Sequence, residues 1–326
     1  MSNQEEKQRH YEIVRSQSVA SGNRRHFLPT TKGESGDETS AGGDGGNEEQ
    51  WTGAFYFIQA ADTQFGMIDN YLKKLENPKW DEEIRLSELL VEKCNKLQPK
   101  PIFMVVCGDL TDAWPGTQMR KQQVYDFKRI FSQLDQSIPL VCVCGNHDIG
   151  NEPTLESLSE YRQDFGDDYY YFIKMGVLFI VLNSQFYQHR ANLEDYARGQ
   201  DIWLDQILDK CKEFKYSIVF EHIPWFLQRP DEEDEYFNID KSTRLHWLKK
   251  FKDAGVSKIM CGHYHRNAGG WYENIELVVT SAVGAQLGSD KSGIRLVRML
   301  ETGIEHKYYA LDDIPDRVDI YQEKEQ

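Results

Sequence analysis

The stretch that decides the fold is Ile102-Phe103-Met104-Val105-Val106-Cys107-Gly108-Asp109-Leu110-Thr111-Asp112. It consists of an apolar run followed by a glycine and two aspartates. Short apolar runs that end in glycine or polar residues are typical of buried strands. Four more segments follow such runs: Asp62-Thr63-Gln64, Gly145-Asn146-His147-Asp148, Glu221-His222 and Gly262-His263-Tyr264-His265. In open α/β sheets, binding sites form outside the carboxyl ends of the strands. The five strand ends can therefore bring Asp, Asn and His side chains together, as a metal site requires.

Helical patterns lie between these strands. Apolar residues recur at helical spacing over about 80–97, 117–136, 200–213 and 241–254. The first half therefore alternates strand, helix and strand, as in a layered α/β fold. After residue 165 the pattern changes to a hairpin around Met175-Gly176, and late strands are predicted at 276–282, 294–300 and 304–310.

Composition divides the chain into three parts. Residues 1–50 are rich in Gly, Ser and acidic residues and have little to bury, so we expect them to be disordered. Residues 51–312 show no internal repeat or linker and are predicted to form one domain. Residues 313–326 are expected to be a polar tail.

Charge and cysteine usage restrict the possible partners and location. The net charge of −15 over 326 residues argues against binding to nucleic acid or to an anionic membrane. The first residues lack the apolar stretch of a secretion signal, and no run is long enough to span a membrane. Six cysteines without disulfide-like spacing are expected to pack in the core. These features predict a soluble, cytoplasmic protein.

The five segments resemble the calcineurin-like metallophosphoesterase superfamily, whose pattern is DxH, GDxxD, GNH[DE], a lone His and then GHxH. The resemblance covers about residues 54–310. The segments 145–151, 183–187 and 262–270 resemble one branch of it, whose activity class is that of serine/threonine protein phosphatases. The resemblance implies an α/β fold: a β-sandwich of two mixed sheets flanked by helices, in αββα layers.

The resemblance also implies two divalent cations. One would be held by Asp62, Gln64, Asp109 and His265, and the other by Asp109, Asn146, His222 and His263. Two cations about 3.5–4 Å apart need a bridging carboxylate, here Asp109, together with neutral ligands on each side. This mixture of oxygen and nitrogen suits Mn, Fe or Zn without selecting among them. Because His263 and His265 flank Tyr264, we expect them to share one face of a strand.

Catalytic residues follow from the same resemblance. Such a metal pair lowers the pKa of a shared water to about 7, which supplies a bridging hydroxide to attack phosphorus. His147 is expected to protonate the leaving oxygen, and Asp112 to orient that histidine with its carboxylate. Asp148 is expected to be structural. Arg266 is a candidate for binding a phosphate oxygen, with a surface position as the alternative.

Gln64 departs from the superfamily, which mostly has histidine there. An amide oxygen binds first-row ions more weakly than imidazole. Two metals with a weakened first site, one tight metal, or a Gln64 that binds only through water are all compatible with this change. A scaffold that has lost catalysis is the alternative from another class, although it predicts erosion at several ligands and only Gln64 differs.

The resemblance favours a phosphomonoesterase whose partner is a phosphoprotein bearing phosphoserine or phosphothreonine. The alternative is a phosphodiesterase that cleaves a small diester or a cyclic nucleotide. The long segment 184–200 is a hypothetical cover of the pocket. The acidic run 231–235 is read as solvated surface or as a rim that favours basic substrates.

Aromatic and histidine residues outside the five segments receive structural interpretations. We expect 169–171 and Trp247 to pack in the core, and His189 and His246 to lie outside the site. Trp114 and Trp225 either line the mouth of the cleft or close the core.

Overall fold

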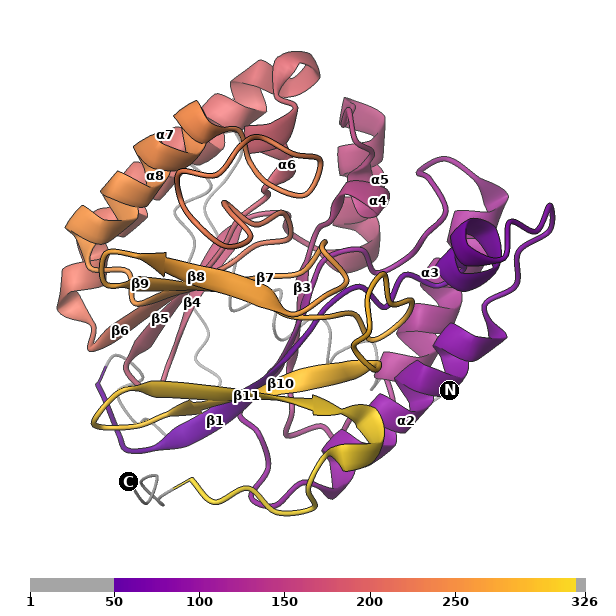
Figure 1. The fold of residues 1–326 in the computed structure, drawn as a ribbon, viewed down its shortest axis with the longest axis horizontal. Coiled ribbons are helices and arrows are strands. Elements are labelled where there is room, and N and C mark those ends of the chain that lie inside the picture. The colour runs from indigo at the N-terminus through magenta and orange to yellow at the C-terminus, as the bar shows by residue number, and fades with distance from the viewer. Residues whose placement is uncertain (1–49, 321–326) are drawn as a thin grey trace, which may run out of the picture.

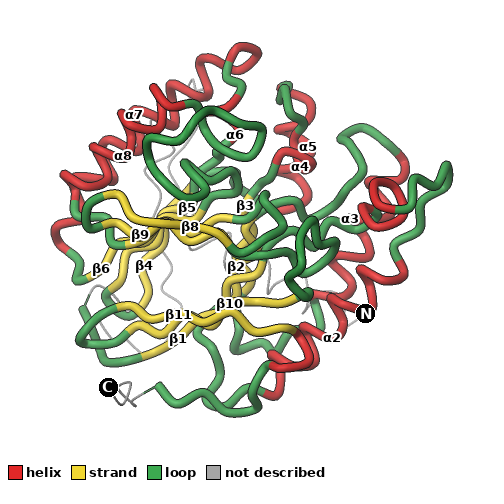
Figure 2. Tube along the Cα trace, in the orientation of Figure 1, coloured by secondary structure: helices red, strands yellow, loops and turns green. Residues whose placement is uncertain are grey.

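Two β-sheets packed face to face carry helices on their outer faces, as the computed structural model of residues 50–320 shows (Figure 1). The sheets have the orders β11-β10-β1-β2-β3 and β4-β5-β6-β7-β9-β8. The tube in Figure 2 shows the strands gathered in the middle, with the long helices on two opposite sides. The predicted αββα layering is therefore confirmed.

The first sheet combines three parallel strands with an antiparallel pair. Its strands are β1 (Phe55–Ala60), β2 (Met104–Cys107), β3 (Leu140–Val143), β10 (Gly293–Met299) and β11 (Ile304–Ala310). Parallel β1, β2 and β3 end at the same edge, with Ile58 opposite Met104 and Met104 opposite Leu140. The first three predicted segments, which begin at Asp62, Gly108 and Gly145, follow these strands at this edge.

The second sheet has four parallel strands between two antiparallel edge strands. Its strands are β4 (Tyr170–Lys174), β5 (Val177–Val181), β6 (Tyr216–Phe220), β7 (Lys258–Cys261), β9 (Ile275–Val279) and β8 (Ala268–Tyr272). The predicted hairpin at Met175-Gly176 joins β4 to β5. The last two predicted segments, Glu221-His222 and 262–265, directly follow strands β6 and β7.

Four long helices cover the sheets. α2 (Asp81–Lys96) and α3 (Gln118–Phe131) pack on the first sheet, and α7 (Glu194–Lys210) and α8 (Lys241–Ala254) on the second. The shorter helices are η2 (Ile68–Leu72), α4 (Asn146–Ile149), α5 (Leu155–Phe165), α6 (Gln185–Gln188), η3 (Ala191–Leu193), η4 (Cys211–Glu213) and η5 (Leu311–Asp313).

Alternation along each strand builds two kinds of core. In β1, Tyr56 and Ile58 face the helices, whereas Phe57 faces the other sheet. Between the sheets, the rings of Phe57 and Phe103 stack with centroids 4.7 Å apart, and Phe57 meets Phe179 edge-on at 5.6 Å. Each fully buried phenylalanine stabilises the fold by about 1.5–3 kcal/mol. These layers fix the two sheets relative to each other.

Some expected boundaries were wrong. α7 begins at Glu194 and α6 occupies 185–188, so the segment 184–200 is largely helical rather than a long loop. The helix expected over 117–136 ends at Phe131, and α5 was not predicted. Beyond 312 the chain still packs, because Ile314 and Val318 are buried. Residues 1–49, expected to be disordered, and residues 321–326 of the expected tail lie outside the described residues.

Candidate metal centre

The five segments meet where the carboxyl ends of strands from both sheets come together. Hydrogen bonds between main-chain groups join the segments directly: Asp62 N donates to Gly108 O (3.0 Å), and Gly262 N donates to His222 O (3.1 Å). The main-chain N–H of His263 donates to the carboxylate of Asp62 at 3.1 Å, so the site lies between the two sheets rather than along the edge of one. Its side chains come from loops that are fixed by these short connections.

Two glycines allow this close approach. A Cβ atom on Gly108 would lie 2.3 Å from Nδ1 of His222, and one on Gly145 would lie 2.1 Å from Oδ1 of Asp109. In each case a candidate ligand from another segment occupies the space that a side chain would need. The glycines that begin the second and third segments therefore make room for the centre.

The backbone is strained at the candidate ligands. Of the eight described non-glycine residues with positive φ, five are Asp62, Gln64, Asp109, His263 and His265. This conformation costs roughly 1–2 kcal/mol per residue and concentrates at functional sites. The expectation that His263 and His265 share a strand face was wrong, because β7 ends at Cys261. A left-handed backbone at each histidine, not strand alternation, directs these side chains.

Two groups of side chains could each hold a metal ion. The first consists of Asp109, His222 and His263, and the second of Asp62, Asp109 and His265. Within each group the possible ligand atoms lie within 4.8 Å of one another, and every residue is buried. Nε2 of His222 lies 3.3 Å from Oδ2 of Asp109, and Nε2 of His265 lies 3.3 Å from Oδ1 of Asp62. Asp109 belongs to both groups, which is the position of a bridging ligand.

Main-chain carbonyl groups orient the three histidines. Nδ1 of His222 lies 2.8 Å from Cys107 O, and Nδ1 of His265 lies 2.6 Å from Ala285 O. For His263 it is Nε2 that lies 3.3 Å from a carbonyl, that of Tyr236. When one ring nitrogen donates its proton to a carbonyl, the opposite nitrogen keeps a free lone pair that can bind a metal. Metal-binding histidines are usually held in this way.

The two candidate amide ligands are also oriented. Nδ2 of Asn146 donates to Oδ1 of Asn151 (2.9 Å), and Oδ1 of Asn146 lies 3.1 Å from Nε2 of His222. Nε2 of Gln64 donates to Oδ1 of Asp112 (3.2 Å). Oε1 of Gln64 is buried and has no hydrogen-bond partner among the described residues. Such an atom costs about 1–3 kcal/mol, and a cation would supply the missing contact. The residues therefore fit a metal centre.

Asp109 and His263 are held in the charge states that a cation needs, whereas His222 is not. Burial would lower the pKa of His222, but Asp109 outweighs it and raises that pKa to about 9, so a cation must displace the proton of His222. Burial alone would raise the pKa of the Asp109 carboxyl, but His222 and His147 outweigh it and hold that pKa well below its usual range. Burial and the neighbouring His222 lower the pKa of His263 to about 3. An ionised carboxylate and a neutral imidazole are the forms that bind metals.

His147 lies beside the ligands. Its main-chain N–H donates to Oδ1 of Asp109 (2.8 Å), and its Nδ1 lies 2.8 Å from the main-chain oxygen of Asp112. The indole of Trp114, itself 45 % exposed, stacks on the imidazole with centroids 4.6 Å apart. Trp114 thus borders the site, whereas Trp225 is fully buried in the core.

The Asp112 carboxylate lies beside His147, as expected, but makes its hydrogen bonds with other residues. Its Oδ1 is 3.5 Å from Nδ1 of His147, whereas its oxygens accept hydrogen bonds from Gln64 and from Nδ2 of Asn70 (2.9 Å). The main-chain carbonyl of Asp112 makes the close contact with His147 instead. The carboxylate of Asp112 therefore orients the candidate ligand Gln64 directly.

Three ionisable residues near the centre, Asp148, Glu221 and Arg266, make their contacts with groups other than the candidate ligands. Asp148, whose pKa is raised to about 6 by burial, accepts hydrogen bonds from the N–H groups of Gly145 (2.8 Å) and Leu110 (3.1 Å). Glu221 is buried, which raises its pKa well above the usual range, and it contacts Sγ of Cys261. Arg266 donates to Leu287 O and lies over the ring of Tyr264 at 4.7 Å. None of these contacts directs Arg266 toward the candidate ligands.

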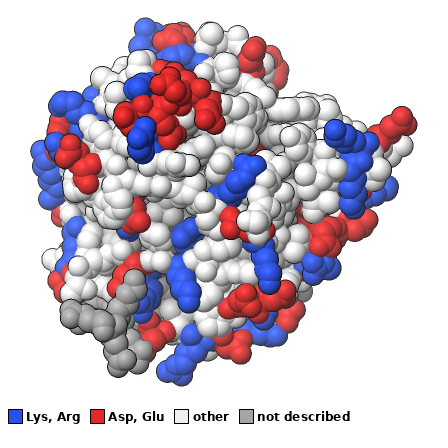
Figure 3. Space-filling view, in the orientation of Figure 1, with Lys and Arg blue, Asp and Glu red and all other residues white. Residues whose placement is uncertain are grey.

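The acidic run 231–235 lies in the loop between β6 and α8. Figure 3 shows acidic side chains gathered beside α6, where this loop passes. The carboxylate of Glu232 accepts hydrogen bonds from the N–H groups of Leu227 (2.6 Å) and Gln228 (2.9 Å), and Asp234 pairs with Arg244 at 2.9 Å. Part of the run therefore holds its own loop together.

Sequence reasoning missed Tyr236, which follows this acidic run. Its main-chain oxygen contacts His263 and its hydroxyl contacts Asn146 at 3.4 Å. No metal-ligand pattern includes tyrosine at this spacing. The neighbouring acidic run was the only signal that marked the loop.

The other predictions about side chains are confirmed. All six cysteines are buried and unpaired. The residues 169–171 and Trp247 are buried, and His189 and His246 are exposed.

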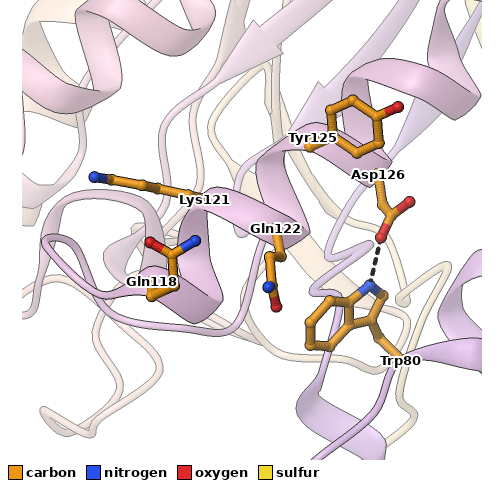
Figure 4. A pocket seen from close by; sticks show the side chains of 6 residues that line it. All are labelled: Trp80, Gln118, Lys121, Gln122, Tyr125 and Asp126. Atoms are coloured by element: carbon orange, nitrogen blue, oxygen red, sulfur yellow. Dashed lines mark hydrogen bonds between the residues drawn. The ribbon is translucent and has the colours of Figure 1, made fainter.

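A hollow of about 380 Å³ lies apart from the ligands, on α3 and the residue before α2 (Figure 4). Its lining residues are Trp80, Gln118, Lys121, Gln122, Tyr125 and Asp126.

Comparison with known proteins assigns the family. Residues 55–267 match the family described as calcineurin-like phosphoesterase. The chain belongs to this family. A mouse (Mus musculus) protein named "Serine/threonine-protein phosphatase CPPED1" is 48 % identical over 272 residues, which cover 82 % of this chain and 87 % of that protein. The expected phosphoester hydrolase is thus confirmed at the level of the family.

A more distant sequence relative and a solved structure are also similar to this chain. A protein of Arcobacter nitrofigilis named "Probable glycerophosphodiester phosphodiesterase GpdQ" is 23 % identical over 205 residues, 60 % of this chain and 68 % of that protein. The crystal structure of a dimetal phosphatase from Danio rerio superposes with a TM-score of 0.55 at 16 % identity, over 79 % of this chain and 99 % of that one. Among residues 50–320, no helix is long and apolar enough to cross a membrane.

Proposed function

We propose that this chain is a metal-dependent phosphomonoesterase that removes phosphate from serine or threonine of a phosphoprotein. The observation that carries the proposal is the pair of ligand groups that share Asp109. The name of the mouse relative supports the choice of a protein phosphatase within the family.

Seven side chains are proposed to hold two divalent cations. Asp62, Gln64 and His265 would bind one, Asn146, His222 and His263 the other, and Asp109 both. When bound, such cations activate a water as nucleophile and neutralise charge on the phosphate. The first group offers one nitrogen and three residues with oxygen donors, and the second two nitrogens and two residues with oxygen donors. The set suits Mn, Fe or Zn.

His147 is proposed as the general acid. Its Nδ1 is fixed by the carbonyl of Asp112, and Trp114 covers one face of the ring. The ring is 20 % exposed, so Nε2 can meet a leaving group that enters from solvent. A protonated imidazole there gives its proton to the serine or threonine oxygen as the P–O bond breaks. Arg266 has no part in this proposal because its guanidinium is engaged by Leu287 and Tyr264.

The test uses metal-free protein with a phosphoserine peptide and an aryl phosphodiester, each with added Mn²⁺, Zn²⁺ or Mg²⁺. We expect metal-dependent release of phosphate from the peptide. Asp109→Asn and His147→Ala should lower the rate at least about 100-fold. Asp313→Asn and His246→Ala are matched controls, because neither residue belongs to the site, and both should retain full activity. Peptide turnover that persists in Asp109→Asn would contradict the proposal.

A diesterase is the second candidate, favoured by the similarity to the bacterial protein named as a diesterase. The same ligand groups would serve, since diesters and monoesters both need metal-activated water. Turnover confined to the aryl diester would establish this candidate instead. Absence of turnover with every metal would favour a binding scaffold.

A further inference from the structure

Tyr236 connects solvent with the metal centre. It lies in the loop between β6 and α8, and its side chain is 57 % exposed. Its main-chain oxygen lies 3.3 Å from Nε2 of His263, and its ring is tilted against that imidazole with centroids 5.2 Å apart. Phe237 packs edge-on against Tyr236 at 5.1 Å and so supports the ring. The residue therefore has a fixed place beside two candidate ligands, His263 and Asn146.

The hydroxyl group of Tyr236 has an unused proton. Nδ2 of Asn146 is the donor in the 3.4 Å contact, so Oη of Tyr236 is the acceptor. Within residues 50–320 we find no acceptor for the O–H proton itself. The other end of the same amide, Oδ1 of Asn146, faces His222 among the ligands. A free donor thus lies at the solvent-exposed border of the site.

In the described part of the chain, the candidate ligands have no cationic side chain in contact with them. Of the hydrogen bonds and ion pairs that the seven ligand side chains make within residues 50–320, none involves lysine or arginine. Arg266, the arginine nearest to them in sequence, is held by Leu287 and Tyr264. Phosphoryl oxygens that cations do not hold need fixed donors where negative charge gathers in the transition state.

We propose that the hydroxyl group of Tyr236 donates a hydrogen bond to a non-bridging oxygen of the substrate phosphate, which makes Tyr236 a further catalytic residue. This inference rests on the proposed phosphatase function. The phenol stays intact and transfers no proton. Its hydrogen bond stabilises negative charge on the phosphate from the side of Asn146, while His147 protonates the leaving oxygen.

The test is Tyr236→Phe, which removes only the hydroxyl and keeps the ring against His263. In the Mn²⁺-loaded protein we expect kcat/KM for the phosphoserine peptide to fall about 10–100-fold, less than for a fully buried donor because the ring is half exposed. Binding of inorganic phosphate, measured by calorimetry, should weaken about tenfold. Metal content and Tm should stay as in the wild type. Tyr125→Phe, on an exposed tyrosine of α3, is the matched control and should change none of these quantities.

The outcomes separate this proposal from the proposed function. If the wild type releases phosphate and Tyr236→Phe matches it in rate and phosphate affinity, the hydroxyl contacts no substrate and the inference is wrong. If Tyr236→Phe loses bound metal, the hydroxyl acts by orienting Asn146, which also overturns it. If the wild type shows no turnover, phosphate binding still decides: weaker binding by Tyr236→Phe supports the contact, and equal binding refutes it.

Discussion

At the scale of single residues, the site depends on side chains that orient other side chains. Asp112 accepts hydrogen bonds from both Gln64 and Asn70, and the first of these turns Oε1 of Gln64 away from Asp112. Without that contact the amide of Gln64 could rotate and present its NH₂ group to a cation. Gln64, the weakest candidate ligand, is therefore oriented by Asp112.

Asp112→Asn tests this dependence. Gln64 and Asn70 donate to different oxygens of the Asp112 carboxylate, and asparagine replaces one of these oxygens with an NH₂ group that cannot accept. We therefore expect metal affinity to fall roughly 10–100-fold, as for other residues that orient metal ligands. One of the two bound ions should be lost first in competition with a chelator. Asp126→Asn, a change at a half-buried aspartate of α3 outside the site, should leave both affinities unchanged. Unaltered metal binding by Asp112→Asn would show that Gln64 needs no such support.

The sequence allowed the candidate ligand residues to be selected because their types follow apolar strands in a recognisable order. It did not predict the contacts of the Asp112 carboxylate, because these depend on Gln64 and Asn70, which lie more than forty positions away. Tyr236 could not be predicted either. Its place beside Asn146 depends on the path of a loop that no periodic pattern describes.

At the scale of elements, helix ends decided which boundaries could be predicted. α8 begins where the carboxylate of Asp240 accepts hydrogen bonds from the N–H groups of Ser242 and Thr243, and ends at Gly255 with φ of 89°. Its limits agree with the predicted 241–254. The first turns of α7 contain charged residues and Gly199, which hide the apolar spacing. Only the later part of that helix was therefore predicted.

Gly199→Ala should stabilise the protein. Gly199 lies inside α7, and an added Cβ would meet only Oη of Tyr169, at an ordinary distance of 3.7 Å. Alanine is favoured over glycine in a helix by about 1 kcal/mol. We expect the free energy of unfolding in urea to rise by about that amount, with catalytic activity unchanged. A lower free energy of unfolding would mean that α7 cannot accept the methyl group.

Glu276 links three strands of the two sheets. It pairs with Lys258 on β7, and its Oε1 lies 3.1 Å from Nε2 of His306 on β11. Burial raises the pKa of this carboxyl, but His306 and Lys258 outweigh it and lower the pKa to about 2. Because the folded pKa lies below the unfolded value, the ionised carboxylate stabilises the fold above about pH 4.5, and this stabilisation is lost as the pH falls toward 2.

Glu276→Gln should therefore destabilise the protein in a pH-dependent way. We expect the free energy of unfolding to fall by about 1 kcal/mol at pH 7, and the difference from wild type to shrink between pH 4.5 and 2. Glu273→Gln, at an exposed position in the turn before β9, is the control and should show no such dependence. A difference that stays constant over this pH range would exclude the ionised carboxylate as its cause.

At the scale of the whole molecule, packing brings together residues that the sequence separates by two hundred positions. Asp62 accepts hydrogen bonds from the main-chain N–H of His263 at 3.1 Å, although these residues follow strands of different sheets. The aromatic layer between the sheets, with Phe57, Phe103 and Phe179 in contact, holds the two strand edges in register. The αββα layering was predictable from the resemblance, but the meeting of two sheets at the site required the structure.

One measurement tests the central claim, that two cations held through Asp109 hydrolyse a phosphoester. Metal-free protein is titrated with Mn²⁺, and bound metal and phosphate release from a phosphoserine peptide are measured in the same samples. We predict that the protein binds two ions and that turnover rises with the second. Asp109→Asn should bind at most one ion and remain inactive. Full turnover with a single ion per chain, or turnover without any metal, would contradict the account.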